Sequence, residues 1–213
     1  MKILSIDPSN LSGGDPMAAV LLESSNSIHI TGAKTWNNTD FSTVESDIAR
    51  IYHEKNCDYI AIERNSMGKR IAHALIHEHN LAVKSFYTAR APKTEKLDIM
   101  DKMEHTNWIL KLHSQNRLKW VTAQSQDMKE LHRQWNIFGE YKKGTLAAPS
   151  GEHDDLMMAL LGGTFVIRRL GFEGTLFFMN INDNQNDSNR AAVISELSNE
   201  VKNNNTGLTW KTK

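Results

Sequence analysis

The stretch Pro149–Gly163 concentrates side chains that can do chemistry, reading Pro-Ser-Gly-Glu-His-Asp-Asp before a long apolar run. Ser150 can cap a helix here, because its hydroxyl accepts a backbone N–H that would otherwise lack a partner. Asp154 and Asp155 would then fall in the first turn, where the positive end of the helix dipole favours negative charge. Apolar residues continue almost unbroken to Ile167 and predict a helix that is buried on most sides.

Two further acids end apolar runs that are typical of strands. Asp7 follows Ile3–Ile6, and Glu63 follows Asp58–Ile62. Strand ends on the same edge of a sheet lie close together, so these acids can converge with the pair at the start of the late helix. Taken alone, Asp154 and Asp155 also fit acids that only cap a helix, and Asp7 and Glu63 fit acids that only end a strand. It is their order along the chain that points to a common site.

Several carboxylates at one point cannot all stay ionised without a counter-charge. Oxygen ligands of this kind suit a hard divalent cation. Two Mg²⁺ or Mn²⁺ ions about 4 Å apart would supply that charge, one activating water and the other stabilising the leaving oxygen of a phosphodiester. The acids therefore predict a two-metal site for phosphodiester hydrolysis.

The order of strand-like and helix-like segments that carry these acids predicts an α/β protein. A mixed central sheet would be flanked by helices, with an antiparallel meander of three strands first and parallel additions afterwards. The expected strands are Ile3–Ile6, Met17–Glu23, Ser27–Trp36, Asp58–Ile62, Val83–Tyr87, Arg117–Val121 and Thr175–Ile181, with a strand or hairpin over 137–146. The expected helices cover about 42–55, 68–80, 97–114, 125–135 and 151–170.

Charge, cysteine content and the length of the apolar segments limit what kind of protein this can be. The 213 residues carry no net charge, so any contact with DNA must come from local basic clusters. A single cysteine, Cys57, excludes an intramolecular disulfide and a cysteine-based zinc cluster. No segment reaches membrane-spanning length without charge, so we expect a soluble intracellular protein that does not contact a membrane. Residues 1–181 are predicted to form one domain and residues 182–213, rich in Asn, Asp, Ser and Gln, a flexible tail.

The segments that carry the acids are Ile3–Pro8, Tyr59–Asn65 with Gly68, and Gly151–Leu160. Together they resemble the nuclease domain of the large terminase subunit of tailed viruses. The resemblance covers roughly residues 1–170, and the Gly-x-His-Asp-Asp element with its apolar helix is its most specific part. It implies the ribonuclease-H-like fold, which is shared with Holliday-junction resolvases.

The resemblance also implies an activity: divalent-metal-dependent cleavage of double-stranded viral DNA during genome packaging, in the cytoplasm of the host cell. By position, Asp7 would bridge two Mg²⁺ or Mn²⁺ ions, Glu63 would bind one, and Asp154 would hold the other with Asp155 adjacent. We favour Asp154 as the direct ligand because Ala159 then falls five residues on, as in related resolvase-like helices.

The implied partners are double-stranded DNA, an ATPase motor domain, the portal and the small terminase subunit. The sequence contains no Gly-x-x-x-x-Gly-Lys-Ser/Thr loop, so we expect either an excised nuclease domain or a free-standing relative.

Basic side chains flank the predicted metal edge and could contact phosphates, although such residues also fit a solvated helix surface. The candidates are Arg64, Lys69, Arg70, Arg90, Lys93 and Lys96. His153 is a possible auxiliary residue that positions water or moves a proton, or it is only solvated. His73 and His77 have the i, i+4 spacing of a metal pair, but without a third ligand we interpret them as a solvated helix face.

Two alternative functions remain open. A resolvase of the same fold would bind four-way junctions as a homodimer. The basic insertion and the Asn-rich tail speak weakly against it. A non-catalytic binding module would keep the fold without the activity, and the presence of all the acids speaks against that.

Overall fold

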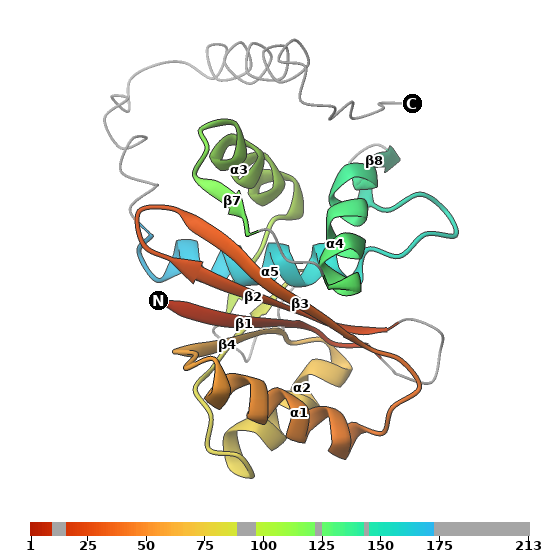
Figure 1. The fold of residues 1–213 in the computed structure, drawn as a ribbon. Helices are drawn as coiled ribbons and strands as arrows, with labels where there is room; N and C mark the ends of the chain where they lie inside the picture. Colours follow the sequence, from red (N-terminus) through yellow and green to blue (C-terminus); the bar gives the residue numbers. More distant parts are fainter. Residues whose placement is uncertain (10–15, 89–96, 122–124, 143–144, 173–213) are drawn as a thin grey trace.

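The centre of the molecule is a seven-stranded sheet with the strand order β6-β5-β4-β1-β2-β3-β7 (Figure 1). The computed structural model describes residues 1–9, 16–88, 97–121, 125–142 and 145–172. The strands of this sheet are β1 (Lys2–Asp7), β2 (Met17–Ser24), β3 (Ile28–Trp36), β4 (Tyr59–Glu63), β5 (Val83–Tyr87), β6 (Asp98–Ile99) and β7 (Leu118–Trp120).

The sheet is mixed in the way the sequence predicts. Strands β1, β2 and β3 form an antiparallel meander. Strand β4 adds parallel to β1, β5 to β4 and β6 to β5, while β7 adds parallel to β3. The carboxyl ends of β1, β4, β5 and β6 therefore meet at one edge.

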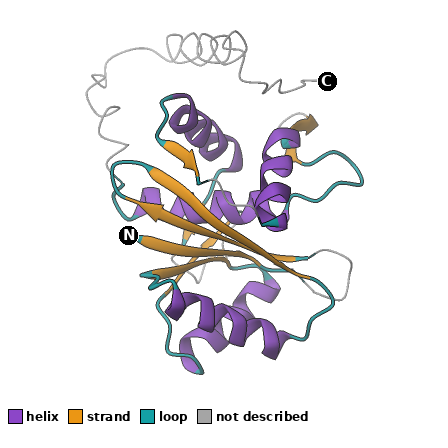
Figure 2. Ribbon diagram, in the orientation of Figure 1, coloured by secondary structure: helices purple, strands orange, loops and turns teal. Residues whose placement is uncertain are grey.

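Helices cover both faces of the sheet (Figure 2). One face packs against α1 (Phe41–Glu54) and α2 (Ser66–His77), and the other against α3 (Lys102–Ser114), α4 (Gln126–Ile137) and α5 (Asp155–Arg169). Successive strand residues point to opposite faces. Accordingly Leu4 and Ile6 of β1 join the α1/α2 core and Ile3 joins the α5 core. A separate hairpin of β8 (Gly139–Lys142) and β9 (Thr145–Ala147) lies between α4 and α5 in the chain.

Helix α5 lies directly against the sheet, and every residue from Asp155 to Ile167 is buried, as the apolar run predicts. Two glycines permit this close approach. A Cβ at Gly162 would lie 2.5 Å from the Phe86 ring, and one at Gly163 would lie 2.5 Å from Leu22 Cδ1. No larger side chain fits between helix and sheet there, so the glycines fix how α5 crosses β1 and β2.

The start of α5 differs from the prediction. The helix begins at Asp155 rather than just after Ser150, and Ser150 does not cap it. Gly151 has a φ of +86°, and the Glu152 N–H donates to the Pro149 carbonyl at 3.0 Å. A turn therefore takes up the residues that a helix starting at Ser150 would have used.

Other differences are smaller. Helix α2 begins two residues earlier than expected, and the two-residue strand β6 was not predicted. The predicted strand Thr175–Ile181 and the tail over 182–213 lie outside the described residues. Within the described ranges, no helix is long and apolar enough to cross a membrane.

Candidate active site

Asp7 and Glu63 end two neighbouring parallel strands. The register pairs Ile6 of β1 with Ile62 of β4, so the two acids are the next residues along each strand. Ile6 and Ile62 both face the α1/α2 core. Because side chains alternate along a strand, both acids are on the opposite face, which α5 covers. Both are half-buried.

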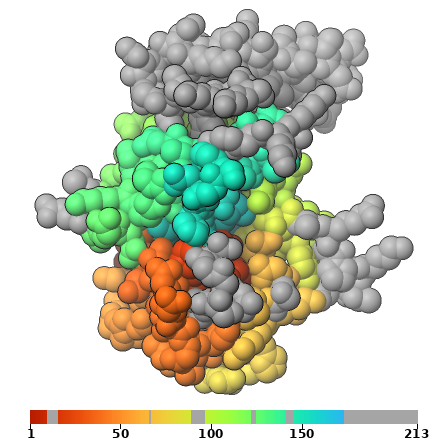
Figure 3. Space-filling model, turned by 90° about the vertical axis from the view of Figure 1, so that its right-hand side faces the viewer, coloured from red at the N-terminus to blue at the C-terminus, as the bar shows by residue number. Residues whose placement is uncertain are grey.

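The third part of the site is the start of α5, on the side of the molecule where β1 ends (Figure 1). Asp154 occupies the N-cap position without a side-chain cap hydrogen bond, and Asp155 is the first helical residue and is buried. Figure 3 looks onto this edge, where the end of β1 surfaces between the α1/α2 layer and the α4/α5 layer.

The charges of the other three acids act on Asp7. The pKa of Asp7 is raised well above its ordinary value, first by desolvation and then by the negative charges of Glu63, Asp155 and Asp154, in that order. Like charges act this way only when they are close and poorly screened. The structure thus brings together the acids that the sequence singled out, and it leaves them with an excess of negative charge.

Glu63 is held by a residue that the sequence analysis did not single out. The hydroxyl of Thr88 donates a hydrogen bond to Glu63 Oε1. Thr88 directly follows β5, the strand beside β4, and the register pairs Glu63 with Phe86. The only sequence signal was a hydroxyl residue immediately after a predicted strand.

The loops after β1 and β4 are tied together at the start of α2. The Asn65 side chain accepts a hydrogen bond from the Gly68 N–H at 2.8 Å and donates one to the Pro8 carbonyl at 3.4 Å. A Cβ at Gly68 would lie only 1.8 Å from the Glu63 carbonyl oxygen. Helix α2 therefore abuts the end of β4, which helps to fix the backbone that carries Glu63.

The acids on the α5 side have different surroundings. Asp154 Oδ2 accepts a hydrogen bond from the Ala148 N–H at 3.3 Å. The His153 ring, about half exposed, places Nδ1 at 3.5 Å from Asp155 Oδ2. Glu152 instead pairs with Arg133 at 2.7 Å. His153 thus adjoins the site, while Glu152 is engaged elsewhere.

Lys102 is a second residue that the sequence analysis did not identify. It is the first residue of α3, is half-buried, and its positive charge lowers the pKa of Asp7 against the effect of the acids. The start of α3 thus contributes a positive charge that acts on Asp7, although none of the four acids belongs to α3.

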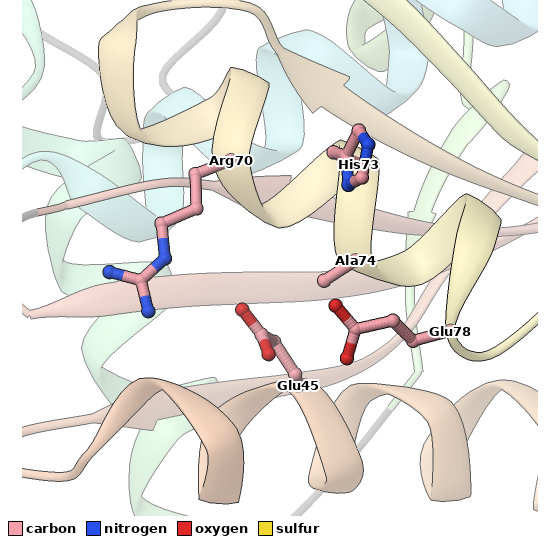
Figure 4. A pocket seen from close by; sticks show the side chains of 5 residues that line it. All are labelled: Glu45, Arg70, His73, Ala74 and Glu78. Atoms are coloured by element: carbon pink, nitrogen blue, oxygen red, sulfur yellow. The ribbon is translucent and has the colours of Figure 1, made fainter.

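The predicted DNA-contact residues lie in different places. Arg64 follows β4 directly and is half-buried, and Lys69 is exposed on α2. Arg70 places its guanidinium 4.4 Å from the centre of the Phe41 ring and faces Glu45 across a hollow of about 250 Å³ between α1 and α2 (Figure 4). None of the four acids lines that hollow. The remaining candidates, Arg90, Lys93 and Lys96, lie outside the described residues.

The acids are of the type that binds hard divalent cations, although the residues that the structure describes do not form a complete coordination site. In the part of the chain that the structure describes, no three His, Cys, Asp or Glu side chains are grouped closely enough to hold a metal ion. The chemistry nevertheless fits, because the acids offer only oxygen donors, and the raised pKa of Asp7 marks negative charge that a cation would neutralise. His73 and His77 bring their rings to 4.4 Å, but they belong to no larger group of ligands among the described residues.

Comparison with known proteins decides the family. Residues 4–162 match the model of the terminase RNaseH-like domain. The chain belongs to this family. The resemblance drawn from the sequence and the ribonuclease-H-like fold that it implied are thereby confirmed.

Solved terminase nucleases share the fold at low sequence identity. The large terminase nuclease of thermophilic phage G20c with bound magnesium is 14% identical, with a TM-score of 0.58 over 76% of this chain and 79% of that one. The nuclease domain of the large terminase subunit of bacterial virus Sf6 is 12% identical, with a TM-score of 0.54 over 75% and 86%. A search of curated protein sequences gave no significant match.

Proposed function

We propose that this terminase nuclease domain cleaves double-stranded viral DNA during genome packaging, in the cytoplasm of the infected cell, by two-metal hydrolysis of the phosphodiester. The observation that carries the proposal is the convergence of Asp7, Glu63, Asp154 and Asp155 on one sheet edge, where their charges raise the pKa of Asp7. The phage G20c nuclease with bound magnesium and the nuclease domain of virus Sf6 with manganese support the choice of cofactor by analogy.

The residues take distinct roles in this proposal. Asp7 is influenced by the charges of both Glu63 and the α5 acids and would bridge two Mg²⁺ or Mn²⁺ ions, with Glu63, which accepts a hydrogen bond from Thr88, holding one of them. When bound, the ions would activate a water molecule and stabilise the leaving oxygen. His153, beside Asp155, would assist by positioning water or moving a proton.

Within the adjacent pair we now propose Asp155 rather than Asp154 as the direct ligand. Asp155 has the larger effect on the pKa of Asp7 and is buried at the start of α5. Asp154 already accepts a hydrogen bond from the Ala148 N–H, so its carboxylate would help to hold the backbone that leads into α5. This reverses the preference that the sequence spacing suggested.

DNA would lie along the edge where the strands end. We propose phosphate contacts from Arg64 and Lys69, extended by Arg90, Lys93 and Lys96. Arg70 stacks on Phe41, so its DNA contact stays a prediction with less support. Contacts of this kind do not read sequence. The choice of cleavage site would then come from an ATPase motor, the portal and the small terminase subunit.

The test is plasmid cleavage with Mn²⁺ by the wild-type chain and by Asp7→Asn, which keeps the size of the side chain and removes its charge. Wild type should nick and linearise the plasmid, and Asp7→Asn should not. An Asp7→Asn protein that cuts at the wild-type rate would refute the proposed site. A chain that cuts a synthetic four-way junction but spares plasmid would favour the resolvase alternative.

A further inference from the structure

Helix α5 begins without a side-chain cap of its own. An N-cap side chain normally accepts the backbone N–H of the second or third helical residue. Asp154 stands at the N-cap position, but its backbone (φ −129°, ψ 12°) is not extended, and its carboxylate accepts the Ala148 N–H at 3.3 Å instead. The N–H of the third helical residue, Met157, therefore needs another acceptor. Met157 is fully buried, and a buried N–H without a partner is costly.

Gln134 of α4 supplies this acceptor. Its side-chain Oε1 accepts the Met157 N–H at 3.1 Å, and Gln134 is only 3% exposed. Helix α4 lies beside the start of α5 (Figure 1). It is itself held in place by Met128, Leu131 and Trp135, which join the core around α5. The cap of α5 thus comes from a neighbouring helix that is firmly packed.

The turn that precedes α5 is tied to the same helix. Arg133, the neighbour of Gln134, donates to Glu152 at 2.7 Å and to the two carboxylate oxygens of Glu130 at 2.7 and 2.8 Å. Glu130 Oε1 also accepts from Gln134 Nε2 at 3.2 Å, so one network joins the two ties. The Arg133 ion pairs are partly exposed and contribute little alone, which makes the buried Gln134 hydrogen bond the stronger tie.

The two ties bracket the acids of α5. Glu152 precedes the Asp154–Asp155 pair in the chain, and Met157 follows it, so the backbone is fixed to α4 on both sides of the pair. Gln134 takes the N–H that an N-cap carboxylate usually takes. Neither acid is therefore required to close the helix.

We propose that Gln134 is a positioning residue for the acids of α5, because it caps the helix from outside and holds the turn that carries Asp154 and Asp155. The inference rests on the proposed function, in which these acids bind a divalent cation. Without Gln134, the Met157 N–H lacks a partner and the first turn of α5 loosens. Both carboxylates then spend less time in the arrangement that binds the cation. Groups that orient metal ligands typically change metal affinity about ten- to hundredfold when they are removed.

The experiment uses the full chain with Gln134→Met and a matched control, Thr164→Val. Methionine keeps the length of the side chain but offers no N–H donor and only a weak acceptor. The control removes a buried hydrogen bond of the same helix far from its start, between Thr164 Oγ1 and His105 Nε2 at 3.0 Å. The readouts are the Mn²⁺ dissociation constant from calorimetry, hydrogen exchange along α5 without metal, the free energy of unfolding in urea, and kcat for plasmid cleavage.

Gln134→Met should raise the Mn²⁺ dissociation constant about tenfold or more and speed hydrogen exchange over residues 155–158. Saturating Mn²⁺ should restore most of kcat, because all four acids are still present. Thr164→Val should also lose stability, but its Mn²⁺ dissociation constant should stay within about twofold of wild type, because distant sites act independently. If Gln134→Met folds poorly, Gln134→Leu removes the same acceptor and should show the same loss of Mn²⁺ affinity.

Two results would overturn the inference while leaving the nuclease function intact. Equal Mn²⁺ dissociation constants for Gln134→Met and Thr164→Val would mean that Gln134 only stabilises the fold. Unchanged hydrogen exchange at the start of α5 in Gln134→Met would mean that Gln134 does not hold the first turn. Failure of the wild-type chain to bind Mn²⁺ or to cut any DNA would instead refute the proposed function, and the metal-free exchange would still test the cap.

Discussion

Gly68→Ala should destabilise the protein, although helix propensity alone predicts the opposite. Gly68 lies in the first turn of α2, and replacing glycine by alanine inside a helix usually gains about 1 kcal/mol. Here the new Cβ would lie 1.8 Å from the Glu63 carbonyl oxygen and 3.1 Å from Pro8 Cγ. The first contact is with backbone, so α2 must move away from the end of β4. Overpacking of this kind costs roughly 1–3 kcal/mol, and a contact with backbone falls at the upper end of that range; after the propensity gain of about 1 kcal/mol we expect a net loss of up to about 2 kcal/mol.

The same shift should reach the active site, because the displaced backbone carries Glu63 and the loop after β1. Urea unfolding would measure the free energy of unfolding, and plasmid cleavage at a temperature where the variant stays folded would measure activity. Gly32→Ala is the control, because its Cβ would meet Leu21 at an ordinary 3.5 Å. Its stability should stay within about 0.5 kcal/mol of wild type. A Gly68→Ala protein that is more stable than wild type and cuts normally would refute the close approach of α2 to β4.

Three further predictions concern the acids. Thr88→Val should lower activity or Mn²⁺ affinity about tenfold, because Glu63 loses its hydrogen bond. Thr88→Ser keeps the hydroxyl and should behave like wild type. If Thr88→Val is as active as wild type, the hydrogen bond does not matter. Asp155→Ala should lose more of the Mn²⁺-induced rise in melting temperature than Asp154→Ala, and the reverse order would return the ligand role to Asp154. Because the pKa of Asp7 is raised in the fold, metal-free stability should fall as pH rises from the unfolded pKa through the folded one. Asp7→Asn should flatten that fall in urea titrations, and an unchanged slope would argue against repulsion at Asp7.

Local patterns in the sequence were enough to predict most helices and strands and to single out the four acids as candidates. Alternating and continuous apolar runs indicate strands and helices because a strand repeats every two residues and a helix every 3.6. Asp7 and Glu63 stood out because each ends an apolar strand, and Asp154 and Asp155 because they precede a long buried helix. Strand polarity followed from chain order, since a tight connection favours an antiparallel neighbour and a helical crossover a parallel one.

Only the tertiary structure decided which side chains join the acids. Thr88 and Lys102 reach the site through the parallel pairing of β5 and β6, and such long-range register leaves no periodic trace in either segment. Arg70 follows Lys69 in sequence, yet it faces α1, because the packing of α1 on α2 determines which side of the helix is available. The start of α5 at Asp155 likewise depends on a turn with a positive φ at Gly151 and on contact with the sheet. Local propensity therefore predicted where the carboxylates fall along the chain, and non-local packing determined what surrounds them.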